Sequence, residues 1–127
     1  MMEIRTHHFI IPGARIYVQE IGAGTPIIFL HGNPDSGDLW RELAEQLMPD
    51  YRCIMPDLPS FGRSTIEQNY DFSLENRGQF VEHILNALGI TEQVIVVVHD
   101  HGGPFGLGRA AAQISKGLSA VCADMEP

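Results

Sequence analysis

Five β-branched residues run without interruption from Val94 to Val98 and lead directly into His99-Asp100-His101-Gly102-Gly103. Such a run is typical of a parallel strand that is covered on both faces. Two glycines after the strand permit a sharp turn, which lifts the Asp100 side chain above the sheet edge at the start of a helix. The segment therefore predicts an interior strand that ends in an exposed carboxylate.

Two roles fit a carboxylate at this position. A carboxylate with an unperturbed pKa of about 4 is ionised at neutral pH. Asp100 can therefore attack an electrophilic carbon without a base to activate it. An aspartate before a glycine-rich helix start is also a common N-cap that accepts hydrogen bonds from free backbone N–H groups. The segment alone leaves both interpretations open.

The rest of the chain predicts one domain that alternates strands and helices. Two strands joined at Pro12-Gly13 indicate a hairpin, and three polar loops, 31–34, 57–64 and 99–103, follow later strands. This order predicts an α/β fold: a mostly parallel sheet with an N-terminal antiparallel hairpin and helices on both faces. The expected strands are 4–10, 15–21, 26–30, 51–55, 94–98 and 118–123, and the expected helices are 36–48, 73–88 and 104–115.

Composition restricts the partners and the location. The 127 residues carry a net charge of −8, which argues against nucleic acid or an anionic membrane as a partner. No apolar run approaches a membrane span, and the N-terminus has no signal-peptide pattern, so we expect a cytoplasmic protein. Cys53 and Cys122 are expected in the core. No cofactor is expected, and adjacent His99, Asp100 and His101 diverge too much to form a metal site.

The three polar loops, in this order and spacing, resemble the first half of an α/β-hydrolase from about Thr6 to Ala123. The segment 29–34, Phe-Leu-His-Gly-Asn-Pro, is similar to the loop that helps form the oxyanion hole in that superfamily. The segment 57–64 is similar to the loop after the fourth strand, and 98–102 to the nucleophile elbow. The resemblance implies a truncated α/β-hydrolase fold over 1–127, without the cap region and the C-terminal strands.

An aspartate at the elbow resembles the haloalkane dehalogenases and epoxide hydrolases, whereas serine marks esterases, lipases and peptidases. Val98, two positions before the aspartate, is similar to many dehalogenases, and so is the segment 31–41. One position differs, because dehalogenases place a halide-binding tryptophan where this chain has His101. The resemblance implies a hydrolase acting on a small, apolar halide or epoxide.

The implied mechanism is attack by Asp100 to form an ester. Backbone N–H groups of Asn33 and His101 would face the developing charge, and the Asn33 amide would also hold the leaving group. In this family a later histidine activates water, but the six histidines of this chain all lie at or before position 101. Asp124 or Glu126 falls near the position of the family's acid, although a solvated tail is the simpler interpretation. We therefore expect a fragment, a homodimer or a missing C-terminal half.

Other interpretations remain beside this one. The chain is alternatively an ester-type α/β-hydrolase, or a non-catalytic module that binds a ligand in the same cleft. His31 is expected to bond backbone groups, and Trp40 to lie in the core. The remaining expectations concern small or solvated residues: Gly106 and Gly108 allow close helix–sheet packing, and His7, His8 and His83 are solvated.

Overall fold

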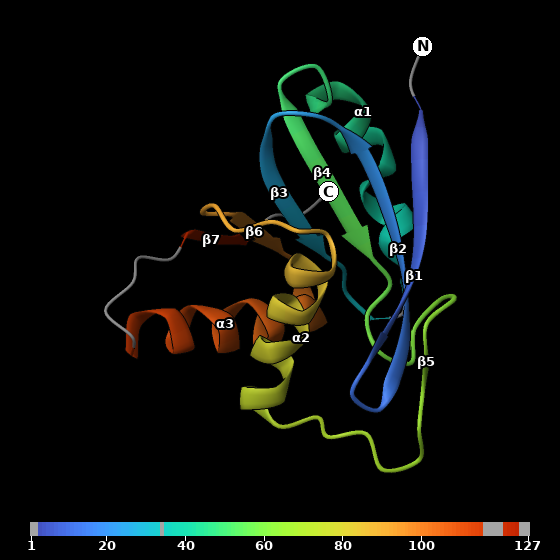
Figure 1. Ribbon diagram of the computed structural model, residues 1–127, viewed down its shortest axis with the longest axis vertical. Coiled ribbons are helices and arrows are strands. Elements are labelled where there is room, and N and C mark those ends of the chain that lie inside the picture. Colours follow the sequence, from blue (N-terminus) through green and yellow to red (C-terminus); the bar gives the residue numbers. More distant parts are fainter. Residues whose placement is uncertain (1–2, 34, 116–120, 125–127) are drawn as a thin grey trace.

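The computed structural model describes residues 3–33, 35–115 and 121–124, with side chains up to residue 113 (Figure 1). Six strands lie in the order β1-β2-β4-β3-β6-β7, and a short β5 pairs with β2 at the side. β1, β2 and β4 are antiparallel neighbours, whereas β4, β3, β6 and β7 run parallel. The predicted fold class is confirmed. The strands are β1 (Ile4–Ile11), β2 (Ala14–Gly22), β3 (Thr25–Leu30), β4 (Tyr51–Pro56), β5 (Thr65–Ile66), β6 (Ile95–Val98) and β7 (Val121–Asp124).

Helices cover both faces of the sheet, as the patterning predicts. Helix α1 (Arg41–Leu47) lies on one face, and α2 (Leu74–Ala87) and α3 (Gly103–Ser115) lie on the other (Figure 1). Side chains of a strand alternate between the faces. Thus Val96 and Val98 of β6 join the core under α2 and α3, while Val97 joins the core under α1.

The helix starts follow local capping chemistry. The Ser73 side chain accepts a hydrogen bond from the Asn76 N–H and opens α2 as predicted, and Gly89 follows its end with a φ of +71°. The helix expected over 36–48 instead begins as a 3-10 turn, Gly37–Trp40, because the Ser36 side chain accepts the Asp38 N–H. Trp40 is fully buried, as predicted.

Two segments differ from expectation because they contact residues that are distant in the sequence. The segment between the expected strand 51–55 and the expected helix 73–88 contains β5, which pairs with Ala14 and Arg15 of β2. Gly108, expected against the sheet, instead packs against Leu74 and Gly78 of α2. Both contacts depend on how distant elements meet, which local patterns do not encode.

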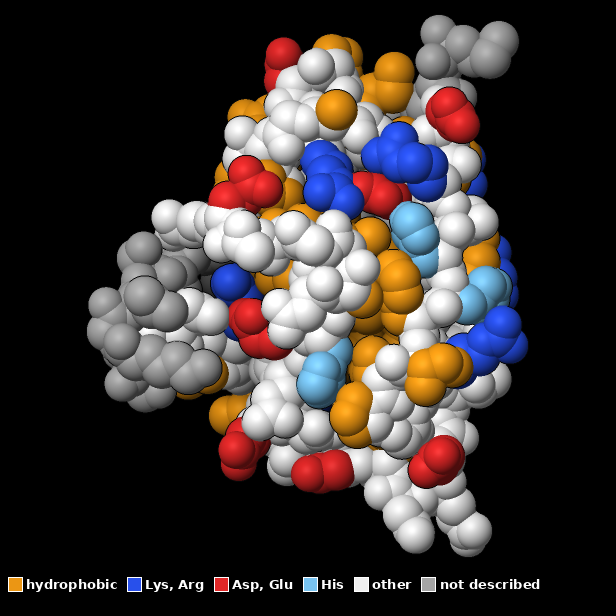
Figure 2. Space-filling view, in the orientation of Figure 1, with side chains coloured by type: hydrophobic (Ala, Val, Ile, Leu, Met, Phe, Trp, Pro, Cys, Tyr) orange, Lys and Arg blue, Asp and Glu red, His pale blue; other side chains and the backbone are white. Residues whose placement is uncertain are grey.

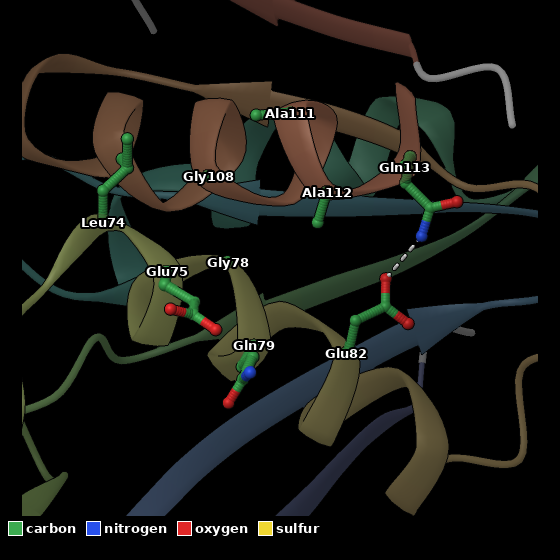
Figure 3. Close-up of a pocket in the computed structure, with 9 residues that line it drawn as sticks. All are labelled: Leu74, Glu75, Gly78, Gln79, Glu82, Gly108, Ala111, Ala112 and Gln113. Carbon is green, nitrogen blue, oxygen red and sulfur yellow. Dashed lines mark hydrogen bonds between the residues drawn. The ribbon is translucent and has the colours of Figure 1, made fainter. Parts of the chain in front are cut away.

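Helices α2 and α3 cross at two glycines. A Cβ on Gly78 would lie 2.5 Å from the Gly108 carbonyl carbon and 2.6 Å from the Arg109 nitrogen. No side chain fits there unless the helices separate. Figure 3 shows the crossing from the side, with a groove of about 510 Å³ that opens between the two helices.

We expect Gly78→Ala to lower the free energy of unfolding by about 2 kcal/mol, because the new methyl group overpacks the crossing. The adjacent Gln79→Ala serves as control, since Gln79 is exposed on the same helix. Urea denaturation measures both. Equal stability of the two variants would contradict backbone contact at this crossing.

A buried carboxylate joins the hairpin to β4. Glu20 is 3% exposed and pairs with Arg52, with Arg5 at 3.4 Å and with the His7 ring nitrogen at 3.0 Å. Figure 2 shows basic side chains (blue) beside an acidic side chain (red) in the upper part of the view. The expectation of a solvated His7 is therefore wrong, because strand pairing brings Glu20 beneath its ring. His8 is exposed and His83 is half-buried.

We expect Glu20→Gln to destabilise the fold by about 1–3 kcal/mol at neutral pH, the usual worth of hydrogen bonds to a charged group. Burial alone would raise the pKa of Glu20, but the bonds from Arg52, His7 and Arg5 bring it below the ordinary 4.5. Because the pKa of Glu20 is lower in the folded than in the unfolded state, the ionised carboxylate stabilises the protein fully above the unfolded-state pKa. This stabilisation is lost as the pH falls through the folded-state pKa. Urea titrations at several pH values should show the difference disappearing in acid. Glu45→Gln, at an exposed site on α1, should show no such pH-dependent loss.

Candidate active site

The predicted turn after β6 is present. Val98 ends the strand, His99 is extended, and Asp100 opens a 3-10 turn, Asp100–Gly102, that leads into α3. Asp100 has a φ of +50°, a backbone region that costs a non-glycine residue of order 1 kcal/mol or more. Its side chain is exposed, and the N-cap of this turn is His99. A strained, exposed carboxylate thus stands at the carboxyl end of an interior strand.

Two glycines allow the turn to approach the neighbouring strand closely. A Cβ on Gly102 would collide with the Leu30 carbonyl oxygen of β3. A Cβ on Gly32 would lie 2.9 Å from the Asp100 Cβ and 3.0 Å from the His99 ring. The loop after β3 and the turn after β6 therefore pack against each other at positions that exclude side chains.

The sheet register brings Asn33 to Asp100. Because Leu30 is opposite Val98 in the parallel pair β3–β6, the two strands end at the same level. The Asn33 N–H donates to the Asp100 Oδ2 at 3.2 Å. This bond and one from the His101 N–H hold the pKa of the Asp100 carboxyl below its ordinary value. The structure thus brings together the three predicted site residues, Asn33, Asp100 and His101.

His31 is buried directly below this loop. Its Nε2 accepts the Leu58 N–H at 2.9 Å, and its Nδ1 lies 2.7 Å from the Gly32 carbonyl oxygen. Burial lowers the pKa of His31, which favours the neutral ring. The prediction that His31 bonds backbone groups is confirmed.

Asp57 is a site-supporting residue that the sequence reasoning did not single out. Its fully buried carboxylate accepts the Gly37 N–H at 2.7 Å and the Arg63 N–H at 2.8 Å. The carboxylate thereby ties the loop after β4 to the segment that follows Asn33. Its position directly after Pro56, at a predicted strand end, is a signal that could have identified it.

Aromatic rings contact His101, the residue after Asp100. The Phe61 ring lies 5.4 Å from His31 and 5.3 Å from His101, and the buried Phe105 ring lies 6.1 Å from His101. His101 therefore lies beside apolar rings, where the resemblance to dehalogenases implies tryptophan. The site combines an exposed carboxylate, two backbone donors and aromatic rings around His101.

The groove, the cysteines and the C-terminal candidates are separate from the cluster of Asn33, Asp100 and His101, or fall on residues that the structure does not describe. The groove of Figure 3 is lined by α2 and α3 and includes none of the predicted site residues. Among the residues described, no group of three His, Cys, Asp or Glu is placed to hold a metal, and no helix is long and apolar enough to cross a membrane. Cys53 is buried, as predicted. The side chains of Cys122 and Asp124 and all of Glu126 lie outside the described residues.

Comparison with known proteins gives consistent matches. Residues 25–121 match the family model described as alpha/beta hydrolase fold. A cis-3-alkyl-4-alkyloxetan-2-one decarboxylase from Shewanella oneidensis is 33% identical over 113 residues, which cover 87% of this chain and 36% of that protein. Two solved structures each cover 98% of this chain. One is the haloalkane dehalogenase DatA from Agrobacterium tumefaciens C58, with a TM-score of 0.77, 32% identity and 41% of that chain covered. The other is the Cif epoxide hydrolase from Acinetobacter nosocomialis, with a TM-score of 0.84, 25% identity and 38% of that chain covered.

These matches confirm the resemblance drawn from the three loops. They add the oxetanone decarboxylases, which the motifs did not suggest. The chain spans about a third of the length of the curated relatives it matches.

Proposed function

Because this chain belongs to the alpha/beta hydrolase fold family, we propose that it carries the nucleophile part of a hydrolase site, in which the Asp100 carboxylate attacks an sp³ carbon and forms an ester. One observation carries the proposal. Asp100 stands exposed on a strained turn with Oδ2 bonded to the Asn33 N–H at 3.2 Å. That bond holds Oδ2, and we assign the attack to Oδ1.

The electron balance of the step is simple. A lone pair on the Asp100 Oδ1 forms the new carbon–oxygen bond, and the carbon–leaving-group bond breaks with its pair on the leaving atom. Oδ2 then becomes the carbonyl oxygen of the ester and stays against the Asn33 N–H. When water later attacks the carbonyl carbon of this ester, negative charge develops on Oδ2, where the Asn33 N–H stabilises it and the His101 N–H is the proposed second donor.

The relatives narrow the substrate class. Their names specify haloalkanes, epoxides and alkyl-substituted oxetan-2-ones. Each of these has an sp³ carbon bonded to an atom that can leave as an anion. The half-buried Phe61 ring beside His101 favours a small apolar substrate of this kind, a halide or an epoxide. The Asn33 side-chain amide and the His101 ring are the proposed donors to the leaving atom.

Release of the ester needs a base to activate water. His31 is held by two backbone groups, so we do not assign it as this base. We propose that residues 1–127 supply the nucleophile and its donors, and that the base is a residue outside them.

Incubation with a 1-haloalkane or a terminal epoxide, followed by intact-mass and peptide mass spectrometry, tests the proposal. The expected result is one stable adduct that maps to Asp100, with the mass of the alkyl group for the haloalkane and of the whole epoxide for the epoxide. A chain that binds the compound without an adduct would instead support a non-catalytic binding module. An adduct confined to Cys53 or to a histidine would also contradict the proposal.

A further inference from the structure

We propose that His31 is a positioning residue, whose Nδ1–H holds the Gly32 carbonyl and thereby directs the Asn33 N–H at Asp100. The inference rests on the proposed function for its catalytic meaning. Its structural part concerns only the orientation of one peptide group, which can be measured separately.

The loop after β4 sets the protonation of the ring. The Leu58 N–H donates to the His31 Nε2 at 2.9 Å, so that nitrogen holds a lone pair and no hydrogen. A neutral imidazole carries its single hydrogen on the other nitrogen. The Nδ1–H must therefore donate to the Gly32 oxygen, 2.7 Å away.

The geometry of a peptide group transmits this bond to the site. In a trans peptide the C=O and the following N–H point in opposite directions in one plane. A bond that fixes the Gly32 carbonyl toward His31 therefore turns the Asn33 N–H away from His31. That N–H meets the Asp100 Oδ2 at 3.2 Å on the other side.

Gly32 makes such a restraint necessary. The site requires glycine here, because a Cβ would lie 2.9 Å from the Asp100 Cβ. Glycine, however, leaves the adjacent peptide group freer to rotate than any other residue does. The His31 bond supplies the restraint that the missing side chain does not.

Two substitutions separate the two bonds of the ring. His31→Asn places an amide NH₂ near the Nδ1 position and keeps the bond to the Gly32 carbonyl. His31→Gln places a carbonyl oxygen near the Nε2 position and keeps the bond from the Leu58 N–H. The two variants lose different bonds, because the bond from the Leu58 N–H joins two loops and the bond to the Gly32 carbonyl lies within one loop. A role limited to joining the loops therefore predicts the larger effect in His31→Asn, whereas the proposal predicts it in His31→Gln.

The first readout is independent of catalysis. In NMR titrations, the Asn33 amide shift should follow the ionisation of Asp100 in the wild type and in His31→Asn, and lose most of this response in His31→Gln. Asp100→Asn provides the baseline. An equal response in both variants would overturn the proposal, even if the wild type forms no adduct with any electrophile.

The second readout is the rate of Asp100 alkylation. A misplaced reacting group can cost about 10²-fold in rate, and the Asn33 N–H holds Oδ2 and so positions the attacking Oδ1. A misdirected N–H should therefore slow His31→Gln by roughly 10- to 100-fold relative to His31→Asn. Equal rates would contradict the inference and leave the proposed function intact. If neither variant folds, the ¹⁵N chemical shifts of the wild-type His31 ring show which ring nitrogen carries the hydrogen. A hydrogen on Nδ1 supports the proposal, and a hydrogen on Nε2 would overturn it.

Discussion

Replacing Asp100 with asparagine should abolish the covalent adduct, with the rate of labelling falling by at least about 10³-fold. The amide has nearly the shape of the carboxylate and can still accept the Asn33 N–H, but it has no charged oxygen to attack carbon. Time-resolved intact-mass spectrometry with a 1-haloalkane measures the loss. The fold should be unaffected, because the Asp100 side chain is exposed.

Asp35→Asn is the matched control. Asp35 is also exposed, and its carboxylate accepts only the local Ser36 N–H in the described structure. We expect labelling of this variant at the wild-type rate. Residual labelling of Asp100→Asn near the wild-type rate would place the nucleophile elsewhere in the chain.

The pH dependence of the adduct offers a second measurement on the wild type. The Asn33 and His101 N–H groups hold the pKa of Asp100 below its ordinary 3.8, and the nucleophile is the ionised form. The labelling rate should therefore stay flat from neutral pH down to below that value, and fall only as the carboxylate becomes protonated. A fall near pH 6 would indicate that a histidine, not Asp100, controls the reaction.

Replacing Gly102 with alanine should be the most destabilising change at the elbow, lowering the free energy of unfolding by about 3 kcal/mol. The new Cβ would collide with the Leu30 carbonyl and lie 2.9 Å from the Leu30 Cβ. Relief requires the turn to move away from β3, which also separates Asp100 from Asn33. Urea denaturation measures the stability, and labelling of Asp100 should fall in the folded fraction.

The neighbouring glycine offers a direct comparison. A Cβ on Gly103 would meet nothing within 4 Å, and Gly103 has a φ of −52° and a ψ of −54°, which are helical. Gly103→Ala should therefore be neutral or stabilise the protein by up to about 1 kcal/mol. If Gly102→Ala were as stable as Gly103→Ala, the close approach of the elbow to β3 would be wrong.

Elements governed by local chemistry could be predicted from the sequence. The β-branched run at 94–98 predicts a buried strand, and three of its residues, Val96, Val97 and Val98, are at most 5% exposed. Ser73 caps α2 through its own side chain. In each case the deciding interactions lie within a few residues, so the pattern of side chains contains the information.

Elements governed by pairing between distant segments could not be predicted. Arg52 reaches Glu20 because β4 lies beside β2, and β5 forms because Thr65 and Ile66 meet the start of β2. The crossing of Gly78 and Gly108 likewise depends on the angle at which two helices pack. Predicting such contacts requires the order of the strands and the placement of the helices, which the local pattern of side chains does not determine.

The candidate site likewise has one part that follows from local sequence and one part that depends on contacts between distant segments. Strand propensity and turn chemistry act over neighbouring residues, so the pattern at 94–103 indicated a carboxylate that follows an interior strand at a tight turn. The resemblance named the Asn33 and His101 N–H groups as its donors, but the contact between Asn33 and Asp100 arises from the packing of distant segments. Asn33 is 67 residues away, and its N–H reaches the carboxylate because β3 and β6 are parallel neighbours in a register that ends both strands at one level.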